Sequence, residues 1–276
     1  MKNNLSIIIL GHNVAHEILP ALKTSQFADE IIYVDTSTGS TDGTLELVRK
    51  YATKIVHSSG YNFSKWRNDG AKVATSSWLL YLDSDERITT ALAKEILTTI
   101  NQKDSHSAYD IPRYEIFLGK HLPHWGDSFV RRLFKTKAFS RYEGKLHEQP
   151  VITGTVGKLN HQLVHLSHKN IDEKIQGTIM WSQLEAEMLF NAKHPPMAGW
   201  RLWRIMFSEF IDRFFKKKLF LDGVEGHIEI IYQLFSRYLT YVRLWEMQKK
   251  PSLKETYTQI DKKLLTDWQE HPIKKD

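Results

Sequence analysis

Three acidic residues stand at the end of one apolar segment of the sequence. In WLLYLDSDER, residues 78–87, the side chains of Asp83, Asp85 and Glu86 follow the apolar run at 77–83. Carboxylates packed together repel one another unless a cation or a hydrogen-bonded ligand lies among them. A hard divalent cation prefers oxygen ligands and can neutralise a leaving diphosphate. The alternative is a solvated acidic turn at the start of the next helix.

Four short, mostly apolar runs must position these carboxylates. The runs lie at 5–10, 30–35, 54–57 and 77–83. Such runs are typical of strands buried on both faces of a sheet. Helical patterns at 44–52 and 63–75 alternate with them, which predicts right-handed βαβ units and a parallel sheet. Ligands bind beyond the carboxyl ends of such strands. Because Asp35 and Asp83 each end a run, we expect both at a ligand site.

The remainder of the chain predicts two further kinds of structure. An amphipathic helix at 88–100 is followed, over 109–166, by short strand patterns that predict an antiparallel or mixed extension of the sheet. From residue 171 the pattern is mostly helical. The helices are expected at 172–193, 199–220 and 226–250. We therefore expect an α/β domain at 1–170 and a helical extension at 171–276.

The composition excludes several classes of protein. The 276 residues include no cysteine, so disulfides and cysteine-ligated zinc are excluded, and a reducing compartment is indicated. No stretch approaches the roughly 20 apolar residues of a membrane span, and we expect a cytoplasmic protein that works at the inner face of the membrane. The formal net charge of +6 suits phosphate-bearing ligands, nucleic acid or an anionic membrane. Since no nucleic-acid motif is present, we expect no nucleic-acid partner.

Four motifs now show a family resemblance. SIIILGHN, YVDTSTGSTDGT, KWRNDGA and WLLYLDSDE occur in the order and approximate spacing of glycosyltransferase family 2. This family contains inverting nucleotide-sugar transferases with the GT-A fold. One departure is a loop after Asp35 that is two residues longer than the family's usual VDSGSTDGT. The pattern FLDG…YLTYVRLWE at 220–246 resembles the branch that includes lipopolysaccharide-core glucosyltransferases, which implies a cell-envelope glycan or glycolipid acceptor.

The resemblance implies roles for the residues at the strand ends. Asp35 would accept a hydrogen bond from the uracil of a UDP-sugar donor. Asp83 would touch the ribose or a metal-bound water, while Asp85 would ligate Mn²⁺ or Mg²⁺. Glu86 is a candidate to position these groups without ligating the metal itself. The alternatives are a helix-cap role for Asp35 and the acidic turn for the others.

Other polar residues are candidates for the same site. Lys65 and Arg67 stand where the family carries groups that face the base or the phosphates; the alternative is a solvated helix face. Many GT-A enzymes supply a late metal ligand near the position of VHLSHK, and a neutral imidazole can complete such a shell. We favour His165 over His168 because it belongs to the apolar strand. The alternative is a packed or exposed histidine.

Transfer to an acceptor hydroxyl also requires a general base. Glu148 in GKLHEQP is the candidate, because the family branch places a His-Glu pair there, and His147 is a candidate to orient a ligand or contact the acceptor. The alternative for Glu148 is a surface glutamate at a strand edge.

The segment 200–220 combines aromatic and basic residues. Its aromatic residues recur at steps of three and four, as in one stripe of a helix, at Trp200, Trp203, Phe207, Phe210 and Phe214. A basic helix with an aromatic face can lie in a membrane interface, which predicts peripheral membrane contact. The alternative is that the stripe packs on the catalytic domain or on a partner subunit.

Three other functions compete with sugar transfer. A haloacid-dehalogenase-type phosphatase places its Asp-x-Asp after the first strand, whereas this motif follows the fourth. A nucleotidyltransferase of related fold needs a glycine-rich, basic signature after the first strand, and GHNVAHE at 11–17 has none. A non-catalytic basic module for membrane surfaces is compatible with the charge, but the chain keeps both Asp83 and Asp85. The sequence therefore predicts a metal-dependent, inverting glycosyltransferase, with the last two functions as alternatives.

Overall fold

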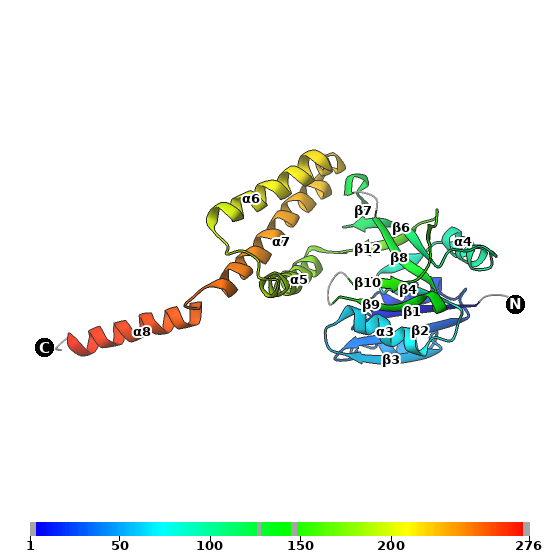
Figure 1. Ribbon diagram of the computed structural model, residues 1–276, viewed down its shortest axis with the longest axis horizontal. Coiled ribbons are helices and arrows are strands. Elements are labelled where there is room, and N and C mark those ends of the chain that lie inside the picture. The colour runs from blue at the N-terminus through cyan, green and yellow to red at the C-terminus, as the bar shows by residue number, and fades with distance from the viewer. Residues whose placement is uncertain (1–3, 126–127, 145–147, 273–276) are drawn as a thin grey trace. The chain divides into compact units, whose positions relative to one another are not determined.

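The computed structural model of the chain describes residues 4–125, 128–144 and 148–272. The chain folds as two compact units, Met1–Lys169 and Asn170–Asp276, which are coloured blue to green and green to red in Figure 1. The first unit contains the strands and the second contains helices. None of the helices in these described ranges is long and apolar enough to cross a membrane.

One mixed sheet forms the centre of the first unit. Among the described residues its strands follow the order β3-β2-β1-β4-β8-β6-β12-β5, with β7 and β11 paired to β6. The strands are β1 (Leu5–Gly11), β2 (Glu30–Ser37), β3 (Lys54–Ser59), β4 (Trp78–Asp83), β5 (Glu86–Ile88), β6 (Ala108–Phe117), β7 (Lys120–His121), β8 (Ser128–Lys135), β11 (Val156–Lys158) and β12 (Leu163–Ser167). The strands β1 to β4 pair in parallel, and β8 joins antiparallel to both β4 and β6. A separate hairpin is formed by β9 (Phe139–Glu143) and β10 (Gln149–Ile152).

Helices cover both faces of this sheet. They are α1 (Ile18–Thr24), α2 (Thr44–Val48), α3 (Phe63–Val73) and α4 (Thr90–Ile100). The alternating side chains of β1 divide between two cores: Ile7 and Ile9 pack with α1, α2 and α4, and Ile8 packs with α3. Within α3, a Cβ on Gly70 would lie 2.6 Å from a methyl carbon of Ile8, so glycine allows this helix to lie directly on the sheet. The predicted α/β sheet flanked by helices is confirmed.

The strand register brings the predicted acidic residues to one edge. Gly11 at the end of β1 is level with Asp35 of β2, and the preceding Leu10 is level with Asp83 of β4. Since β1 lies between β2 and β4, the two aspartates are two strand spacings apart, about 10 Å. The carboxyl edge of the parallel strands therefore carries both.

The described residues of the second unit form four α-helices. They are α5 (Ile171–Asn191), α6 (Gly199–Phe210), α7 (Val224–Gln248) and α8 (Leu253–Glu270). A buried ion pair of 2.7 Å between Lys174 and Glu229 joins α5 to α7. The sequence did not predict α8, whose start is stabilised by a capping box formed by Ser252 and Glu255.

The helix expected at 199–220 is interrupted. It ends as an α-helix at Phe210, continues as a π-helical segment, Ile211–Lys216, and is followed by a 3₁₀ turn, Leu219–Asp222. The predicted aromatic stripe consequently divides into two groups. Trp200, Trp203 and Phe207 are 60%, 79% and 67% exposed, whereas Phe210 and Phe214 stack on one another and Phe214 stacks on Phe220.

Candidate functional site

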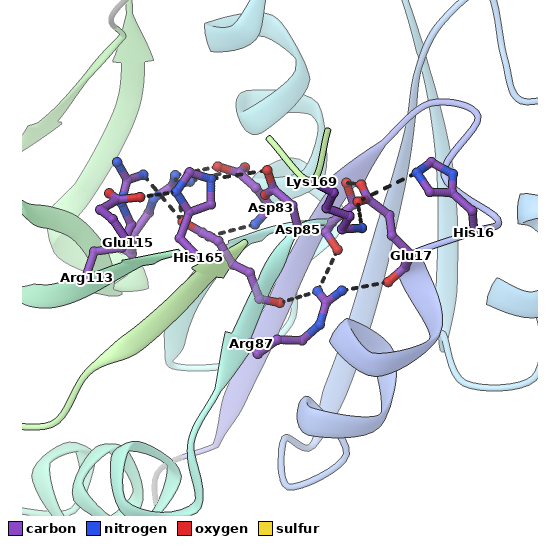
Figure 2. Close-up of polar contacts among 12 residues, drawn as sticks. His16, Glu17, Asp83, Asp85, Arg87, Arg113, Glu115, His165 and Lys169 are labelled. Atoms are coloured by element: carbon purple, nitrogen blue, oxygen red, sulfur yellow. Dashed lines mark hydrogen bonds and ion pairs between the residues drawn. The ribbon is translucent and has the colours of Figure 1, made fainter. Parts of the chain in front are cut away.

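A tight turn between β4 and β5 presents the acidic motif. The side chain of Glu86 is fully buried, and its Oε2 accepts a hydrogen bond of 2.9 Å from the backbone N–H of Asp83. Arg87 donates to the carbonyl oxygens of Ser84 and Glu86, each at 2.7 Å, and to that of Glu17 (Figure 2). Hydrogen bonds from Arg87 and to the buried carboxylate of Glu86 therefore fix the backbone of this turn.

Two buried arginines bind Asp83. Nη2 of Arg132 lies 2.5 Å from one carboxylate oxygen, and Nη2 of Arg67 lies 3.1 Å from the other. Burial on its own would raise the pKa of Asp83, but Arg132 and then Arg67 lower it well below its usual range. Asp83 is thus a carboxylate, and with 32% of its side chain exposed it can still be reached by a ligand.

His165 lies between Asp85 and a second carboxylate. Its Nε2 is 3.1 Å from Oδ2 of Asp85, and its Nδ1 is 2.5 Å from Oε2 of Glu115; Figure 2 shows the imidazole between them. Burial alone would lower the pKa of His165, but the hydrogen bonds to Asp85 and Glu115 raise it to about 10. The sheet explains the placement, because β12 pairs His165 with Glu115 of β6 on one side and with Glu86 of β5 on the other.

These contacts form one continuous chain of alternating charge, which we name the charge row. Every neighbouring pair in it lies within 3.7 Å. In order, its members are Glu148, Arg67, Asp83, Arg132, Glu86, Arg113, Glu115, His165 and Asp85. The burial of Glu86 raises its pKa, Arg132 opposes this, and Asp83 and Asp85 add to it. Most of the predicted site residues therefore belong to one electrostatic unit.

Glu148 lies at one end of the charge row. Its Oε1 accepts a hydrogen bond of 2.7 Å from Nε of Arg67, and its side chain is only 14% exposed. The other end of the Arg67 guanidinium binds Asp83, so the predicted base and the predicted ribose contact share one cation. His147, predicted beside Glu148, lies outside the described residues.

Asp35 and Lys65 hydrogen-bond to residues outside the charge row. Asp35 is buried and accepts hydrogen bonds from the N–H and Oγ of Ser40, so it closes the long loop that follows β2. Lys65 on α3 binds Asp69 at 2.7 Å and Ser58 at 3.0 Å. The ring of His168 makes an edge contact with Phe117.

Three members of the charge row were missed in the sequence. Arg113 and Glu115 belong to β6, and Arg132 belongs to β8. The available signal was charge within strand patterns: Arg113 and Glu115 are two residues apart and so share one face of their strand. Which of the adjacent Arg131 and Arg132 faces the site depends on the register with β6, where a bulge interrupts the pairing.

Asp85 and His165 form a donor set that suits a divalent cation. Neighbouring ligands of an octahedral ion with metal–ligand distances of about 2.1 Å are separated by about 3.0 Å, and Oδ2 of Asp85 lies 3.1 Å from Nε2 of His165. Among the described residues, no group of three or more His, Cys, Asp or Glu side chains is arranged to hold a metal. A cation at this pair would need further ligands from substrate and water.

The chain is similar to known glycosyltransferases. It is 24% identical over 264 residues to an uncharacterized glycosyltransferase of Rickettsia conorii, covering 91% of this chain and 93% of the relative. The uncharacterized glycosyltransferase YibD of Escherichia coli is 26% identical over 111 residues, which are 37% of this chain and 32% of that protein.

Solved structures show weaker likeness. Glucosyl-3-phosphoglycerate synthase from Mycobacterium tuberculosis, solved with Mn²⁺, UDP and phosphoglyceric acid, has a TM-score of 0.45 and 14% identity over 71% of this chain and 81% of that chain. TarS 1–349 of S. aureus, solved with UDP-GlcNAc, has a TM-score of 0.38 and 20% identity over 48% of this chain and 45% of that chain.

The family itself is identified by a sequence model. The model described as glycosyl transferase family 2 matches residues 6–158, more than half of the chain. The match includes most of the charge row and the parallel strands β1 to β4, and it ends before β12. The GT-A fold class expected from the resemblance agrees with the sheet described above. The protein belongs to glycosyl transferase family 2 and is a glycosyltransferase.

Proposed function

We propose that the protein transfers a sugar from a UDP-sugar to an acceptor hydroxyl, with inversion, and that the transfer requires Mn²⁺ or Mg²⁺ held by Asp85 and His165. The observation that carries the proposal is the close pair formed by Oδ2 of Asp85 and Nε2 of His165, 3.1 Å apart, at a turn that ends a central strand of the sheet. The unit at 1–170 would bind donor and catalyse, and the unit at 171–276 would serve the acceptor.

Each polar group then has a proposed role in donor binding. A bound divalent cation would neutralise the negative charge of the departing diphosphate. Asp83, fixed by Arg67 and Arg132, would accept hydrogen bonds from the ribose. Asp35 lies about two strand spacings away and would accept a hydrogen bond from the uracil imide, while Lys65 would face the base or the phosphates.

Glu148 would accept the proton of the attacking hydroxyl. Direct displacement at the anomeric carbon needs a base on the side opposite the leaving group, and a single displacement inverts the configuration. Arg67 fixes Glu148 at 2.7 Å, which orients one oxygen and leaves the other for the acceptor. His147 would orient the acceptor beside it.

The acceptor proposed is a cell-envelope glycan, carried on a lipid. The exposed residues Trp200, Trp203 and Phe207 of α6 are accompanied by Arg201 and Arg204 on the same helix, and Lys216 and its two lysine neighbours follow. Aromatic side chains beside cations match the apolar and anionic layers of a membrane interface. We therefore assign α6 and the segment after it to peripheral contact with an anionic membrane.

Donor binding with and without metal tests the proposal. Purified protein is titrated with UDP and with a panel of UDP-sugars, with Mn²⁺ or with excess chelator, and hydrolysis and thermal stabilisation are recorded. Asp85→Asn is expected to lose metal-dependent binding and turnover while keeping its melting temperature. Asp110→Asn is the matched control, because Asp110 pairs with Arg131 outside the charge row.

Two results would count against the proposal. Full turnover in excess chelator would exclude the metal role of Asp85 and His165. Failure of UDP and every UDP-sugar to bind, while another class of nucleotide sugar binds, would exclude the proposed donor.

A further inference from the structure

The imidazole of His165 can bind a metal beside Asp85 only through Nε2, with its proton on Nδ1. A neutral imidazole has one N–H and one lone pair, on different nitrogens, and a metal ligand must present the lone pair. In this protein Nε2 faces Asp85 and Nδ1 faces Glu115. A cation can bind Nε2 only if the proton that Nε2 donates to Asp85 leaves and the remaining proton lies on Nδ1, beside Glu115.

Glu115 is placed to accept a hydrogen bond from the Nδ1–H of His165. Its Oε2 lies 2.5 Å from Nδ1 of His165, and its Oε1 accepts a hydrogen bond of 2.5 Å from Nε of Arg113. The carboxylate is nine-tenths buried, so these two partners dominate its surroundings. Arg113 also lies 3.7 Å from Glu86, which fixes the guanidinium on its other side.

The strands hold this arrangement rigidly. Glu115 and His165 are paired residues on the adjacent parallel strands β6 and β12, and Arg113 lies two residues before Glu115 on the same face of β6. The alignment thus follows from backbone pairing and does not depend on a loop. Glu115 and Asp85 contact different nitrogens of the imidazole, so Glu115 lies across the ring from the proposed metal position and would not ligate the cation.

We propose that Glu115 is a positioning residue that, supported by Arg113, holds the Nδ1 proton of His165 and so keeps the Nε2 lone pair directed at the metal position beside Asp85. This inference rests on the proposed function, since it assumes that a divalent cation binds there. Partners of this kind orient metal-bound histidines, and their loss typically costs 10–100-fold in metal affinity.

The test measures Mn²⁺ affinity directly, by the EPR signal of free Mn²⁺ in the presence of saturating UDP. Glu115→Gln is expected to raise the Kd for Mn²⁺ about 10–100-fold, with UDP affinity in chelator unchanged. The matched control is Glu30→Gln. Glu30 is also buried and ion-paired, to Lys54 at 2.5 Å, but it is the first residue of β2 and so lies at the edge of the sheet opposite the site. Its variant should bind Mn²⁺ like the wild type.

A double variant separates positioning from general damage. If Glu115 acts through His165, then in a His165→Gln background the residual Mn²⁺ affinity should be the same with or without Glu115→Gln. Should Glu115→Gln fail to fold, Glu115→Asp keeps the charge but shortens the side chain, and the same loss of Mn²⁺ affinity is expected.

Three outcomes are decisive against the inference. It is overturned if the single variant binds Mn²⁺ as the wild type does, or if the loss persists at full size in the His165→Gln background. If the wild type with UDP binds no Mn²⁺, the proposed metal dependence itself fails, and the inference fails with it.

Discussion

Replacing Arg132 with methionine should destabilise the first unit far more than the same change at its neighbour. Arg132 is 9% exposed and binds Asp83 at 2.5 Å and Glu86 at 3.6 Å. Arg132→Met keeps most of the apolar stem and removes the charge that both carboxylates face. Removing one partner of a buried ion pair costs about 3–5 kcal/mol. Because Asp83 keeps Arg67 and Glu86 keeps Arg113, we expect the lower part of that range, about 3 kcal/mol.

Arg131 provides the matched control on the same strand. Its pair with Asp110 at 2.7 Å is more exposed, with 37% of the arginine side chain accessible, and pairs of that kind contribute about 0–1 kcal/mol. For a unit of this size, about 3 kcal/mol corresponds to a fall in melting temperature of roughly 6–12 °C. Urea and thermal unfolding of the two variants, followed by near-UV circular dichroism, measures the difference.

The pH dependence gives this prediction a second test. The pKa of Asp83 in the folded protein lies below its value in the unfolded chain, so its pairing stabilises the fold above about pH 4. That stabilisation declines as the pH falls below the unfolded-state pKa. Without Arg132 the pKa of Asp83 in the folded variant rises towards its usual value, so the variant takes up this proton at a higher pH than the wild type. The difference in unfolding free energy between Arg132→Met and wild type should consequently shrink as the pH falls through that raised pKa, below about pH 4. Equal losses for Arg131→Met and Arg132→Met, or a gap that does not change with pH, would refute the reasoning.

Three further predictions concern the proposed activity. Glu148→Gln should bind donor normally and lose about 10²–10⁴-fold in transfer rate; near wild-type transfer would place the base elsewhere, with Glu143 tested next. Asp35→Ala should weaken UDP binding by about 1–3 kcal/mol in calorimetric titration, and an unchanged Kd would leave Asp35 a structural role through Ser40 and His57. The wild type should sediment with anionic vesicles at low salt and be released at high salt, whereas a variant with lysines 216–218 changed to glutamate stays in the supernatant; equal binding of both would argue against membrane contact.

The parallel part of the sheet could be predicted because its strands are mostly continuous apolar runs separated by helical patterns. The positions of Asp35 and Asp83 then follow from one rule about strand ends. By contrast, β5 has three residues, too few for any periodicity, and so the sequence could not show that Glu86 is buried. Arg132 was missed for a related reason: a charged residue inside a strand looks solvent-facing until the antiparallel partner strand is known.

The helical unit shows the same limit. Helix starts and ends at α5 and α7 follow local signals, and the predictions there differ from the structure by only a few residues. The π-helical segment Ile211–Lys216 coincides with the stacking of Phe210, Phe214 and Phe220. That stacking involves residues on both sides of the turn, so the helical pattern at 199–220 could not reveal where the stripe divides.

The charge row has a consequence for how this sequence can change over evolutionary time. Each interior member faces an opposite charge on both sides, so a single neutral replacement takes from each neighbour one of the opposite charges that it faces, at a cost that marginally stable proteins rarely tolerate. Replacement is easier in adjacent pairs, such as Arg113 with Glu115, where both charges disappear together. In homologous sequences we therefore expect these nine positions to covary as neighbouring pairs along the row, while Arg131 and Asp110 drift as an isolated pair.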